Sequence, residues 1–569
     1  MDGALSPSAG ELSRASALSR ISAPRVCNAG DRWRRRASGT RATVARKSIP
    51  AAGKRMQGGT PLHWRQACRP RLLSRRPATP IFLPWNPAMQ ILRHQLDDLL
   101  ANAVAGPATA GYVAGVWHRG EQIELARGIA NLNTGAEMTV DTRLQIGSVT
   151  KVMTAHLLMR YVEAGRIGLD DPVVAHLPSF ALADSAHAQR LCVRHLLNHT
   201  NGIDADSFSP MTEAGAGATR DFVERLAGFG TLFEPGETIH YSNAGFVVAA
   251  RLIEVLSGKP YNQVLEETLF RPCGMNESCT SAEQAILHRH AVGVFANATS
   301  GELQATRAYL LPPSLAGAGS TPISTVRDML AYGRMHLAGG AIDGTRILAP
   351  ETVAAMQAVT FDAGRPCVPP ICVGWWKVPV SGVTVYWHGG TTYGTTSSFA
   401  VCPELDLVVF TAGTGPGANA LHDQVLLATL AHLGNEAVMP FERGTSSRPL
   451  SRYAGGYRHY PMRLASVAGN ERLSVEAYWT EMDADSRRAM LWPSGGVETG
   501  DGETRYAFDG GSTYVLELAP LAEDLFAPPG TSDAQLCGIN GRLALVSFRG
   551  DGDRPHGVHT RLRYLRREG

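Results

Sequence analysis

The sequence predicts an α+β fold in which an antiparallel sheet is flanked by helices and divided by a helical insertion, followed by a small C-terminal all-β domain. Two observations predict it. Strand patterns lie at both ends of residues 89–437, and a long run of helical patterns separates them. After residue 441, short β-like runs recur between Gly-, Asp- and Pro-rich turns, as is typical of a small sandwich or barrel.

The composition indicates a folded protein. The chain has 569 residues, of which 44% are hydrophobic and 18% are charged, so it can bury a core. No stretch approaches 18 uninterrupted apolar residues, and we therefore expect no transmembrane helix.

Residues 1–88 are predicted to be a disordered basic extension. Up to Pro80 the chain has 17 Lys and Arg against three Asp and Glu, and apolar periodicity is absent. An apolar secretory-signal core is missing, so a targeting segment or a misassigned start near Met89 both fit, and a cytoplasmic or a periplasmic location stays open. The remainder has 37 basic and 48 acidic residues without a basic cluster, which argues against nucleic-acid binding.

The region 89–437 begins with an amphipathic pattern over Gln90–Ala105, which predicts a helix. Alternating segments then predict a hairpin of strands at Gly111–His118 and Gln122–Gly128. The helical patterns that follow are Val149–Glu163, Val193–His199, Arg220–Phe229, Ala244–Leu256, Tyr261–Leu269 and Val326–His336. Strand patterns return at Val383–Trp387, Ser397–Val401 and Leu407–Ala412, before a closing helix at Asn419–Leu433.

A separate domain is predicted over residues 441–569. Its strand patterns are Leu473–Tyr478, Thr504–Phe508, Tyr514–Leu518, Leu543–Phe548 and Thr560–Leu565. Such an appendage either shapes the entrance of an active site or braces the fold.

Ser148 and Lys151 form the first candidate for chemistry. Three residues apart at the start of a helix, they share one face, so the amine can approach the hydroxyl. Serine needs a neighbouring base to become a nucleophile, and a desolvated lysine can supply one. In isolation the pair also fits an N-cap serine and a solvated lysine.

Two further motifs carry suitable groups. In Tyr241-Ser242-Asn243, a tyrosine beside a lysine can act as general base and an asparagine amide can orient a carbonyl. Alone, Asn243 also fits a helix cap and Tyr241 a packed aromatic. In His388-Gly389-Gly390-Thr391, the glycines let a substrate backbone lie along the strand, and a backbone N–H can face an oxyanion. Alone, that motif fits a tight turn with a surface histidine.

The three motifs, spaced 93 and then 147 residues apart, resemble the serine β-lactamase/penicillin-binding-protein superfamily. The resemblance is to its class C β-lactamase-like branch, with D,D-peptidases, D-aminopeptidases and related esterases. It covers about residues 90–435, extends to the phrases Leu169–Val173, Arg194–Gly202 and Leu315–Thr321, and implies the β-lactamase/transpeptidase-like fold.

The resemblance implies a role for each residue. Ser148 is the acylated nucleophile, Lys151 its activating partner, and Tyr241 the general base that also protonates the leaving group. Asn243 binds substrate and orients Lys151, and His388, Gly389, Gly390 and Thr391 form a substrate-binding edge. The backbone N–H groups of Ser148 and Thr391 form the oxyanion hole.

One departure bears on the substrate. His388 stands where β-lactamases usually carry lysine, and a neutral histidine holds a carboxylate less strongly. Peptidase, esterase or amidase activity therefore stays open.

Other patterns point to no further site. His195 and His199 have a zinc-protease spacing, but Leu196 stands in place of the required glutamate. The Gly413–Gly417 loop lacks the glycine spacing of a dinucleotide site, and Gly-x-Ser-x-Gly does not occur. The nine cysteines include no Cys-x-x-Cys; free thiols are favoured, although Cys367 and Cys372 could form a bridge.

The sequence therefore predicts a serine hydrolase that cleaves amide or ester bonds through an acyl-enzyme, without a cofactor or metal. Its expected substrate is a small molecule or a short peptide, and its oligomeric state stays open. The alternatives are a β-lactamase or D,D-carboxypeptidase acting on cell-wall peptides, and a catalytically silent binding protein with the same fold.

Overall fold

The computed structural model describes residues 86–205, 217–297, 300–479, 497–498, 504–505 and 513–569. Up to residue 85, the predicted basic extension lies outside these residues. The described residues from Asn86 to Gly569 belong to one compact unit.

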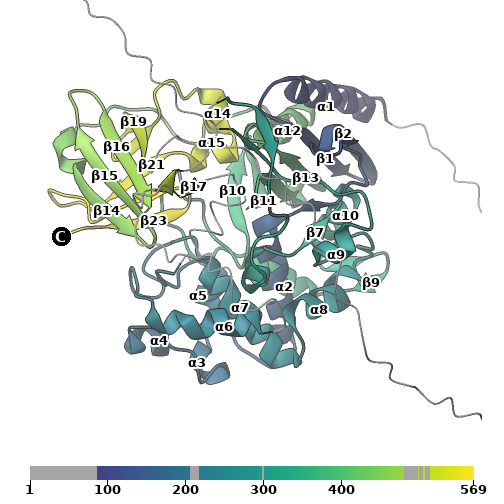
Figure 1. Cartoon of the computed structure of the whole chain (residues 1–569), viewed down its shortest axis with the longest axis horizontal. Helices are drawn as coiled ribbons and strands as arrows, with labels where there is room; N and C mark the ends of the chain where they lie inside the picture. Colours follow the sequence, from purple (N-terminus) through teal and green to yellow (C-terminus); the bar gives the residue numbers. More distant parts are fainter. Residues whose placement is uncertain (1–85, 206–216, 298–299, 480–496, 499–503, 506–512) are drawn as a thin grey trace, which may run out of the picture. The chain divides into compact units, whose positions relative to one another are not determined.

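A seven-stranded antiparallel sheet is the centre of the first domain (Figure 1). In spatial order its strands are β10 (Trp376–Val380), β11 (Val383–Thr391), β12 (Thr395–Cys402), β13 (Leu407–Thr414), β1 (Gly111–His118), β2 (Glu121–Asn131) and β3 (Ala136–Glu137). β1 pairs with β13 in the register Gly111↔Thr414 to His118↔Leu407. The two ends of the domain therefore meet in one sheet, which confirms the predicted fold class.

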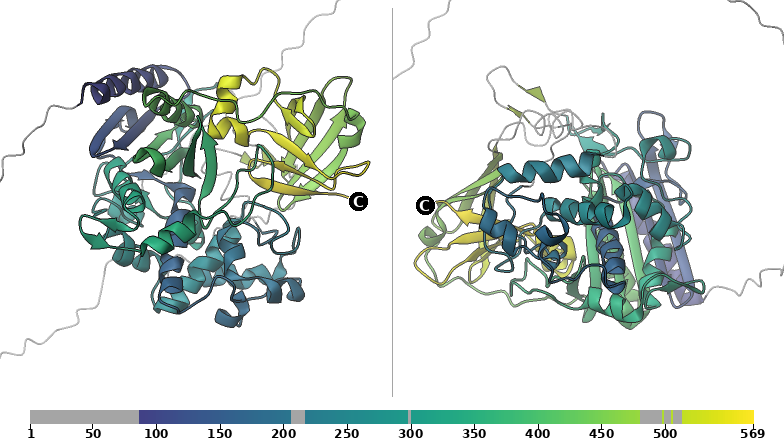
Figure 2. Two further views of the ribbon diagram at one scale, coloured as in Figure 1. Left: turned by 180° about the vertical axis from the view of Figure 1, so that it is seen from behind. Right: turned by 90° about the horizontal axis from the view of Figure 1, so that it is seen from below.

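Helices cover both faces of this sheet (Figures 1 and 2). On one face lie α1 (Pro87–Ala105) and α12 (Ala418–His432), which share a hydrophobic core with the strands. On the other face α10 (Val326–Leu337) and the helical insertion form a second core. α1 begins three residues before the predicted start, because Pro87 suits a first helical position and the Asn86 side chain accepts a hydrogen bond from Ala88 N.

The helical insertion separates β3 from β10. Its helices are η1 (Gly147–Val149), α2 (Thr150–Glu163), α3 (Val173–His176), α4 (Ser185–Arg190), α5 (Val193–Leu197), α6 (Ala218–Arg225), η2 (Leu226–Gly228), α7 (Asn243–Ser257), α8 (Tyr261–Leu265), the π-helical turn η3 (Glu266–Phe270), α9 (Ala282–Ala285), η4 (Pro313–Ala318), α10 and α11 (Pro350–Gln357). The prediction of helix as far as His199 is wrong, since His199 has φ 60° and cannot continue α5.

Short strand pairs complete the insertion. They are β4 (Leu144–Gln145) with β7 (Ile323–Ser324), β5 (Val294–Ala296) with β6 (Leu303–Ala305), and β8 (Ala341–Ile342) with β9 (Thr345–Arg346).

The C-terminal domain is a closed eight-stranded barrel. Its strands are β14 (Gly455–His459), β15 (Met462–Ala468), β16 (Leu473–Trp479), β19 (Thr513–Ala522), β20 (Leu525–Ala527), β21 (Val546–Arg549), β22 (Gly557–Thr560) and β23 (Arg563–Arg567), and β23 pairs with β14 to close it. Aromatic side chains including Tyr453, Phe526 and Phe548 fill its core. The remaining elements are η5 (Pro403–Leu405), η6 (Leu450–Tyr453), the strand pair β17 (Val497–Glu498) and β18 (Thr504–Arg505), α14 (Asp533–Cys537) and α15 (Ile539–Leu543).

Two of the predicted barrel strands need correction. The pattern Leu543–Phe548 starts too early, because Leu543 ends α15 and β21 begins at Val546. The pattern Thr560–Leu565 is not one strand but the end of β22, a two-residue turn and the start of β23. Of the predicted strand Thr504–Phe508, the part after Arg505 lies outside the described residues. Within the described residues, no helix combines the length and the apolar character that a membrane crossing requires.

Candidate active site

Ser148 lies where β4 leads into the helices. It occupies the middle of the single-turn helix η1, directly before α2, rather than the first turn of the α-helix itself. Gly147, before it, has φ 53°, which lets the chain turn sharply there. Ser148 is partly exposed between the buried neighbours Gly147 and Val149, so it is the accessible residue of this turn.

Lys151 is fully buried in the first turn of α2, and its amine lies against three oxygens. Nζ is 3.0 Å from Ser148 Oγ, 2.8 Å from Asn243 Oδ1 and 2.7 Å from the carbonyl oxygen of Ala318. The amide and carbonyl oxygens can only accept hydrogen bonds. A neutral amine therefore satisfies both with its two protons and turns its lone pair towards the Ser148 hydroxyl.

The Tyr241–Asn243 motif lies at the start of α7. The side chain of Ser242 accepts a hydrogen bond from Gly245 N and caps this helix, so the cap is Ser242 and not Asn243. Asn243 is the first helical residue and its side chain reaches Lys151. The Tyr241 ring lies 4.8 Å from Lys151 Nζ, and its phenol forms a hydrogen bond with Ser148.

Burial governs the charges of this group. Loss of hydration, and next the positive charge of Arg563, hold the pKa of Lys151 well below its ordinary value. Burial raises the pKa of Tyr241, and the hydrogen bond with Ser148 opposes that shift. At neutral pH these directions favour an uncharged amine beside an uncharged phenol.

The last four residues of β11 are the third predicted motif. β10 begins at Trp376, opposite Trp387, so His388–Thr391 pair with β12 and extend beyond β10. Gly389 is partly exposed and Thr391 is exposed, which leaves this half of β11 accessible at an edge.

His388 is buried rather than on the surface. Its Nδ1 lies 2.7 Å from the carbonyl oxygen of Gly389 and donates to it, and its ring centroid is 6.2 Å from that of Tyr241. Burial is the main cause that lowers the pKa of His388, to about 3. At pH 7 an imidazole with this lowered pKa is uncharged.

The nucleophile turn and β11 are in main-chain contact. A Cβ atom on Gly147 would lie 2.7 Å from Thr391 N, and a Cβ on Gly390 would collide with the carbonyl oxygen of Ile146 and with Ser397 Oγ. The Ser397 hydroxyl donates to that same carbonyl at 2.8 Å. The glycines thus allow the backbones that carry Ser148 and Thr391 to touch.

We expect Gly390→Ala to separate these two backbones. The added methyl group should lower the free energy of unfolding by about 1–3 kcal/mol, as overpacked sites do. It should also slow any reaction at Ser148 more than the loss of stability explains. Gly228→Ala, where no atom lies within 4 Å of the new Cβ, is the control for stability and for rate. An unchanged melting temperature in Gly390→Ala would contradict the packing argument.

His195 and His199 do not share a helical face. His195 Nδ1 accepts from Cys192 N and His199 Nδ1 accepts from Ser242 N, both at 3.1 Å, so each histidine holds a backbone amide. His199 also stacks on Trp376 and lies 4.5 Å from the Tyr241 ring. It therefore contacts both the main chain and the ring of the Tyr241–Asn243 motif. In the part of the chain that the structure describes, no cluster of three metal-ligating side chains is present.

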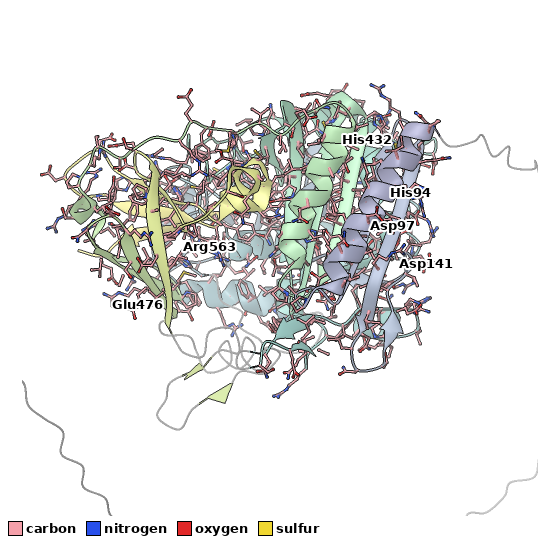
Figure 3. All side chains as sticks on the ribbon, turned by 90° about the horizontal axis from the view of Figure 1, so that it is seen from above. His94, Asp97, Asp141, His432, Glu476 and Arg563 are labelled. Atoms are coloured by element: carbon pink, nitrogen blue, oxygen red, sulfur yellow. The ribbon has the colours of Figure 1, made fainter. Side chains whose placement is uncertain are left out.

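Two groups that contact the candidate site residues were not predicted from the sequence. The first is the carbonyl of Ala318, which lies in the phrase Leu315–Thr321; the resemblance includes this phrase but assigns it no role. Arg563 comes from the barrel strand β23 (Figure 3). Its guanidinium lies 5.6 Å from the centre of the Tyr241 ring. No local pattern around Arg563 announces this contact.

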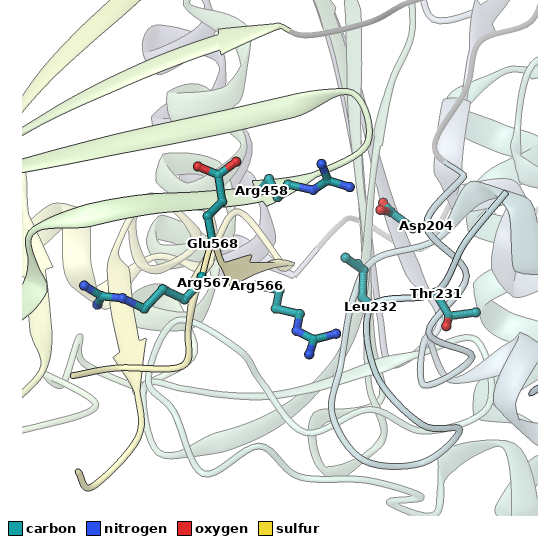
Figure 4. A pocket seen from close by; sticks show the side chains of 8 residues that line it. Asp204, Thr231, Leu232, Arg458, Arg566, Arg567 and Glu568 are labelled. Carbon is teal, nitrogen blue, oxygen red and sulfur yellow. The ribbon is translucent and has the colours of Figure 1, made fainter. Parts of the chain in front are cut away.

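A separate cavity of about 370 Å³ lies near the end of the barrel (Figure 4). Asp204, Leu232, Arg458 and Arg566 help to line it, and none of the predicted site residues does.

The glycine loop and the cysteines that the sequence analysis considered lie in ordinary structural positions. Gly413–Gly417 joins β13 to α12 beside antiparallel neighbours, and the seven described cysteines, Cys367 and Cys372 included, are free thiols.

The chain is similar in sequence to a known protein family and to several of its relatives. The family model described as Beta-lactamase matches residues 96–432. Penicillin-binding protein 4 of Amycolatopsis lactamdurans is 33% identical over 334 residues, which span 58% of this chain and 86% of that protein. Esterase EstB of Burkholderia gladioli is 32% identical over 201 residues, which span 33% of this chain and 51% of the esterase.

Among solved structures, the crystal structure of SurE is similar to 84% of this chain and to 100% of its own chain, with a TM-score of 0.61. The sequence identity is 22%, so this similarity concerns the fold, and its coverage extends into the C-terminal barrel.

Proposed function

The chain belongs to the beta-lactamase family of serine hydrolases, and from that premise we propose that it cleaves amide or ester bonds through an acyl-enzyme on Ser148. The observation that carries this proposal is the placement of Lys151 Nζ. It lies 3.0 Å from Ser148 Oγ and is held there by two acceptors, Asn243 Oδ1 and the Ala318 carbonyl. This is the arrangement of a nucleophile with an oriented base.

In the first step, the Ser148 hydroxyl attacks the substrate carbonyl and passes its proton to the Lys151 amine. The lowered pKa of Lys151 supplies an amine that can accept this proton. The raised pKa of Tyr241 keeps the phenol protonated, so Tyr241 donates to the leaving group and is replenished from Lys151. This order gives the base role to Lys151 first, where the resemblance gave it to Tyr241.

The tetrahedral intermediate carries its negative charge on the former carbonyl oxygen. We assign its stabilisation to the backbone N–H groups of Ser148 and Thr391, whose segments are in contact across Gly147. Water then attacks the acyl-enzyme by the reverse proton path, and the acid is released.

The neutral His388 bears on the substrate class. Because it provides no ion pair for a carboxylate, we propose an ester or amide hydrolase rather than an efficient β-lactamase. A small molecule or a short peptide fits such a site, which the exposed end of β11 borders.

Intact-mass analysis tests the proposal. The full chain is incubated with a fluorophosphonate, p-nitrophenyl esters, D-amino-acid amides and a penicillin, and any adduct is located by peptide mapping. We expect a fluorophosphonate adduct on the peptide that contains Ser148, and turnover of an ester or an amide. A long-lived penicillin adduct without ester or amide turnover would instead support an enzyme that acts on cell-wall peptides. The absence of any adduct at Ser148 would support a catalytically silent binding protein.

A further inference from the structure

The barrel holds the segment that leads to the catalytic tyrosine candidate. Each residue from Thr238 to Tyr241 contacts a barrel residue. The contacts are Arg549 Nη1 with Thr238 Oγ1, His559 Nε2 with the Ile239 carbonyl at 3.1 Å, Tyr564 N with His240 Nδ1 at 3.1 Å, and Tyr241 N with the Leu562 carbonyl at 2.9 Å. The position of Tyr241 therefore depends on a domain that begins 200 residues later in the chain.

The turn that contacts Tyr241 is itself strained. Arg561 and Leu562 join β22 to β23 with φ values of 47° and 65°, in the left-handed region that hairpin turns of two residues require. Such turns favour glycine or asparagine, and neither is present here. Leu562 is buried in the core shared with the sheet domain, and its carbonyl accepts from Tyr241 N. Contact with the sheet domain thus offsets the cost of the turn.

Arg563 follows this turn directly and adds a charge to the contact. Its Nη1 donates to the Tyr241 carbonyl oxygen at 3.4 Å, and its guanidinium lies 5.6 Å from the Tyr241 ring centre. Lys151 Nζ lies 4.8 Å from the same ring centre. The tyrosine therefore has both a lysine and an arginine beside its ring.

The surroundings of Lys151 make this charge important. The titratable groups that face it are Tyr241, His199, His388 and Arg563. Burial lowers the pKa values of both histidines and leaves them neutral at pH 7, and it raises the pKa of the phenol. Burial lowers the pKa of Arg563 only to about 10, so this guanidinium is the permanent charge of the group.

We propose that Arg563 is a positioning residue of the active site: the barrel places its guanidinium against Tyr241, where it fixes the tyrosine main chain and keeps the Lys151 amine unprotonated. A nearby positive charge disfavours a second one, so Lys151 stays ready to accept the proton of Ser148. The C-terminal barrel is then a part of the catalytic apparatus. This inference rests on the roles proposed above for Ser148, Lys151 and Tyr241.

The rate at which a fluorophosphonate labels Ser148 in the full chain, measured from pH 5.5 to 9.5, tests the inference. Removing the charge in Arg563→Gln should shift the acid limb of the rate upward by about one pH unit, the size expected of a partly screened charge at this range. Labelling should then fall by up to tenfold at pH values below the wild-type acid limb, and it should recover at higher pH. Arg563→Met, which keeps an unbranched apolar stem without the charge, should repeat this result.

Two variants separate the charge from the fold. Arg563→Lys keeps the charge and should retain the wild-type acid limb. Arg566→Gln removes a charge from the same strand at an exposed position that lines the separate cavity, and it should change neither the limb nor the rate. Melting temperatures of all four variants exclude misfolding as the cause of a rate change.

The outcomes are distinguishable. A wild-type chain that is not labelled at Ser148 at any pH contradicts the proposed function itself. A labelled wild type, with an unchanged acid limb in folded Arg563→Gln and Arg563→Met, overturns the role of Arg563. A rise in KM confined to carboxylate-bearing substrates, without a shift of the limb, would make Arg563 a substrate contact and also overturn it.

Discussion

Replacing Ser148 by alanine is expected to abolish acyl-enzyme formation and to lower kcat/KM for an ester or amide substrate by about 10⁴-fold or more. The alanine has no nucleophile, and the oxyanion-hole amides alone leave only weak catalysis. Lys151→Met should cost nearly as much, because the serine then loses the amine 3.0 Å from its hydroxyl. Single-turnover labelling and steady-state hydrolysis measure both losses.

The double variant makes this prediction sharper. If Ser148 and Lys151 act as one unit, Ser148→Ala combined with Lys151→Met should be no slower than Ser148→Ala alone. Losses that multiply would show that Lys151 acts independently of the serine. Lys259→Met removes an exposed lysine that pairs with Glu267, and it should leave the rate unchanged.

The fold could be predicted because its strands have regular patterns and because they occur at both ends of the domain, with helices between them. The predicted strands Gly111–His118 and Leu407–Ala412 lie almost 300 residues apart in the chain. Because the few strands at each end of the domain need further strands to form a sheet, the sequence predicted that they pair with each other, and they do. β10 was not predicted, because Pro379 interrupts its pattern. The proline is tolerated there because β10 is the first strand of the sheet, and an edge strand can lack one N–H donor.

The side chains of the candidate site could be predicted from the sequence, whereas the main-chain groups that hold them in place could not. Spacing and chemistry singled out Ser148, Lys151, Tyr241 and Asn243, and the structure brings their side chains together. The Ala318 carbonyl is a main-chain group, which carries no residue-specific signal.

The turn at Arg561 and Leu562 was hidden for a different reason. It interrupts a run, Thr560–Leu565, that reads as one strand and contains no turn residue. The hydrogen bond with Tyr241, 321 residues before Leu562, and the burial of Leu562 in the shared core offset the cost of that conformation. A long-range contact of this kind leaves no local pattern.

Acid is expected to unfold the protein at a pH where many proteins remain stable. Among the described residues, eight buried histidines have lowered pKa values, with burial as the first cause: His156, His199, His240, His336, His388, His422, His459 and His559. The values of His336 and His422 fall to about 3 and that of His459 to about 4. In the unfolded chain each histidine takes up a proton near pH 6.5, while the folded form does so only at these lower values.

Below pH 6.5, unfolding is therefore accompanied by proton uptake, and the free energy of unfolding decreases as the pH is lowered. Each such histidine contributes full stability above pH 6.5 and a loss of about 1.4 kcal/mol per pH unit below it, until the folded pKa is reached. Several of them together would remove a typical 5–15 kcal/mol within one to two pH units. Guanidinium unfolding followed from pH 8 to 5 should show a steep loss below pH 6.5 and an acid midpoint between pH 5 and 6.

His336 offers a direct check of this cause. Both of its ring nitrogens are buried without a hydrogen-bond partner among the described residues, and Tyr332 and Trp375 pack against the ring. His336→Leu removes the titrating group at similar volume, so the dependence of unfolding free energy on pH should weaken by about 1.4 kcal/mol per pH unit below pH 6. His94→Asn, at an exposed position, should leave the slope unchanged. An unfolding free energy that does not change from pH 7.5 to 5 would show that these histidines titrate alike in the folded and unfolded chains. Burial would then also fail to explain why Lys151 and His388 are uncharged at pH 7.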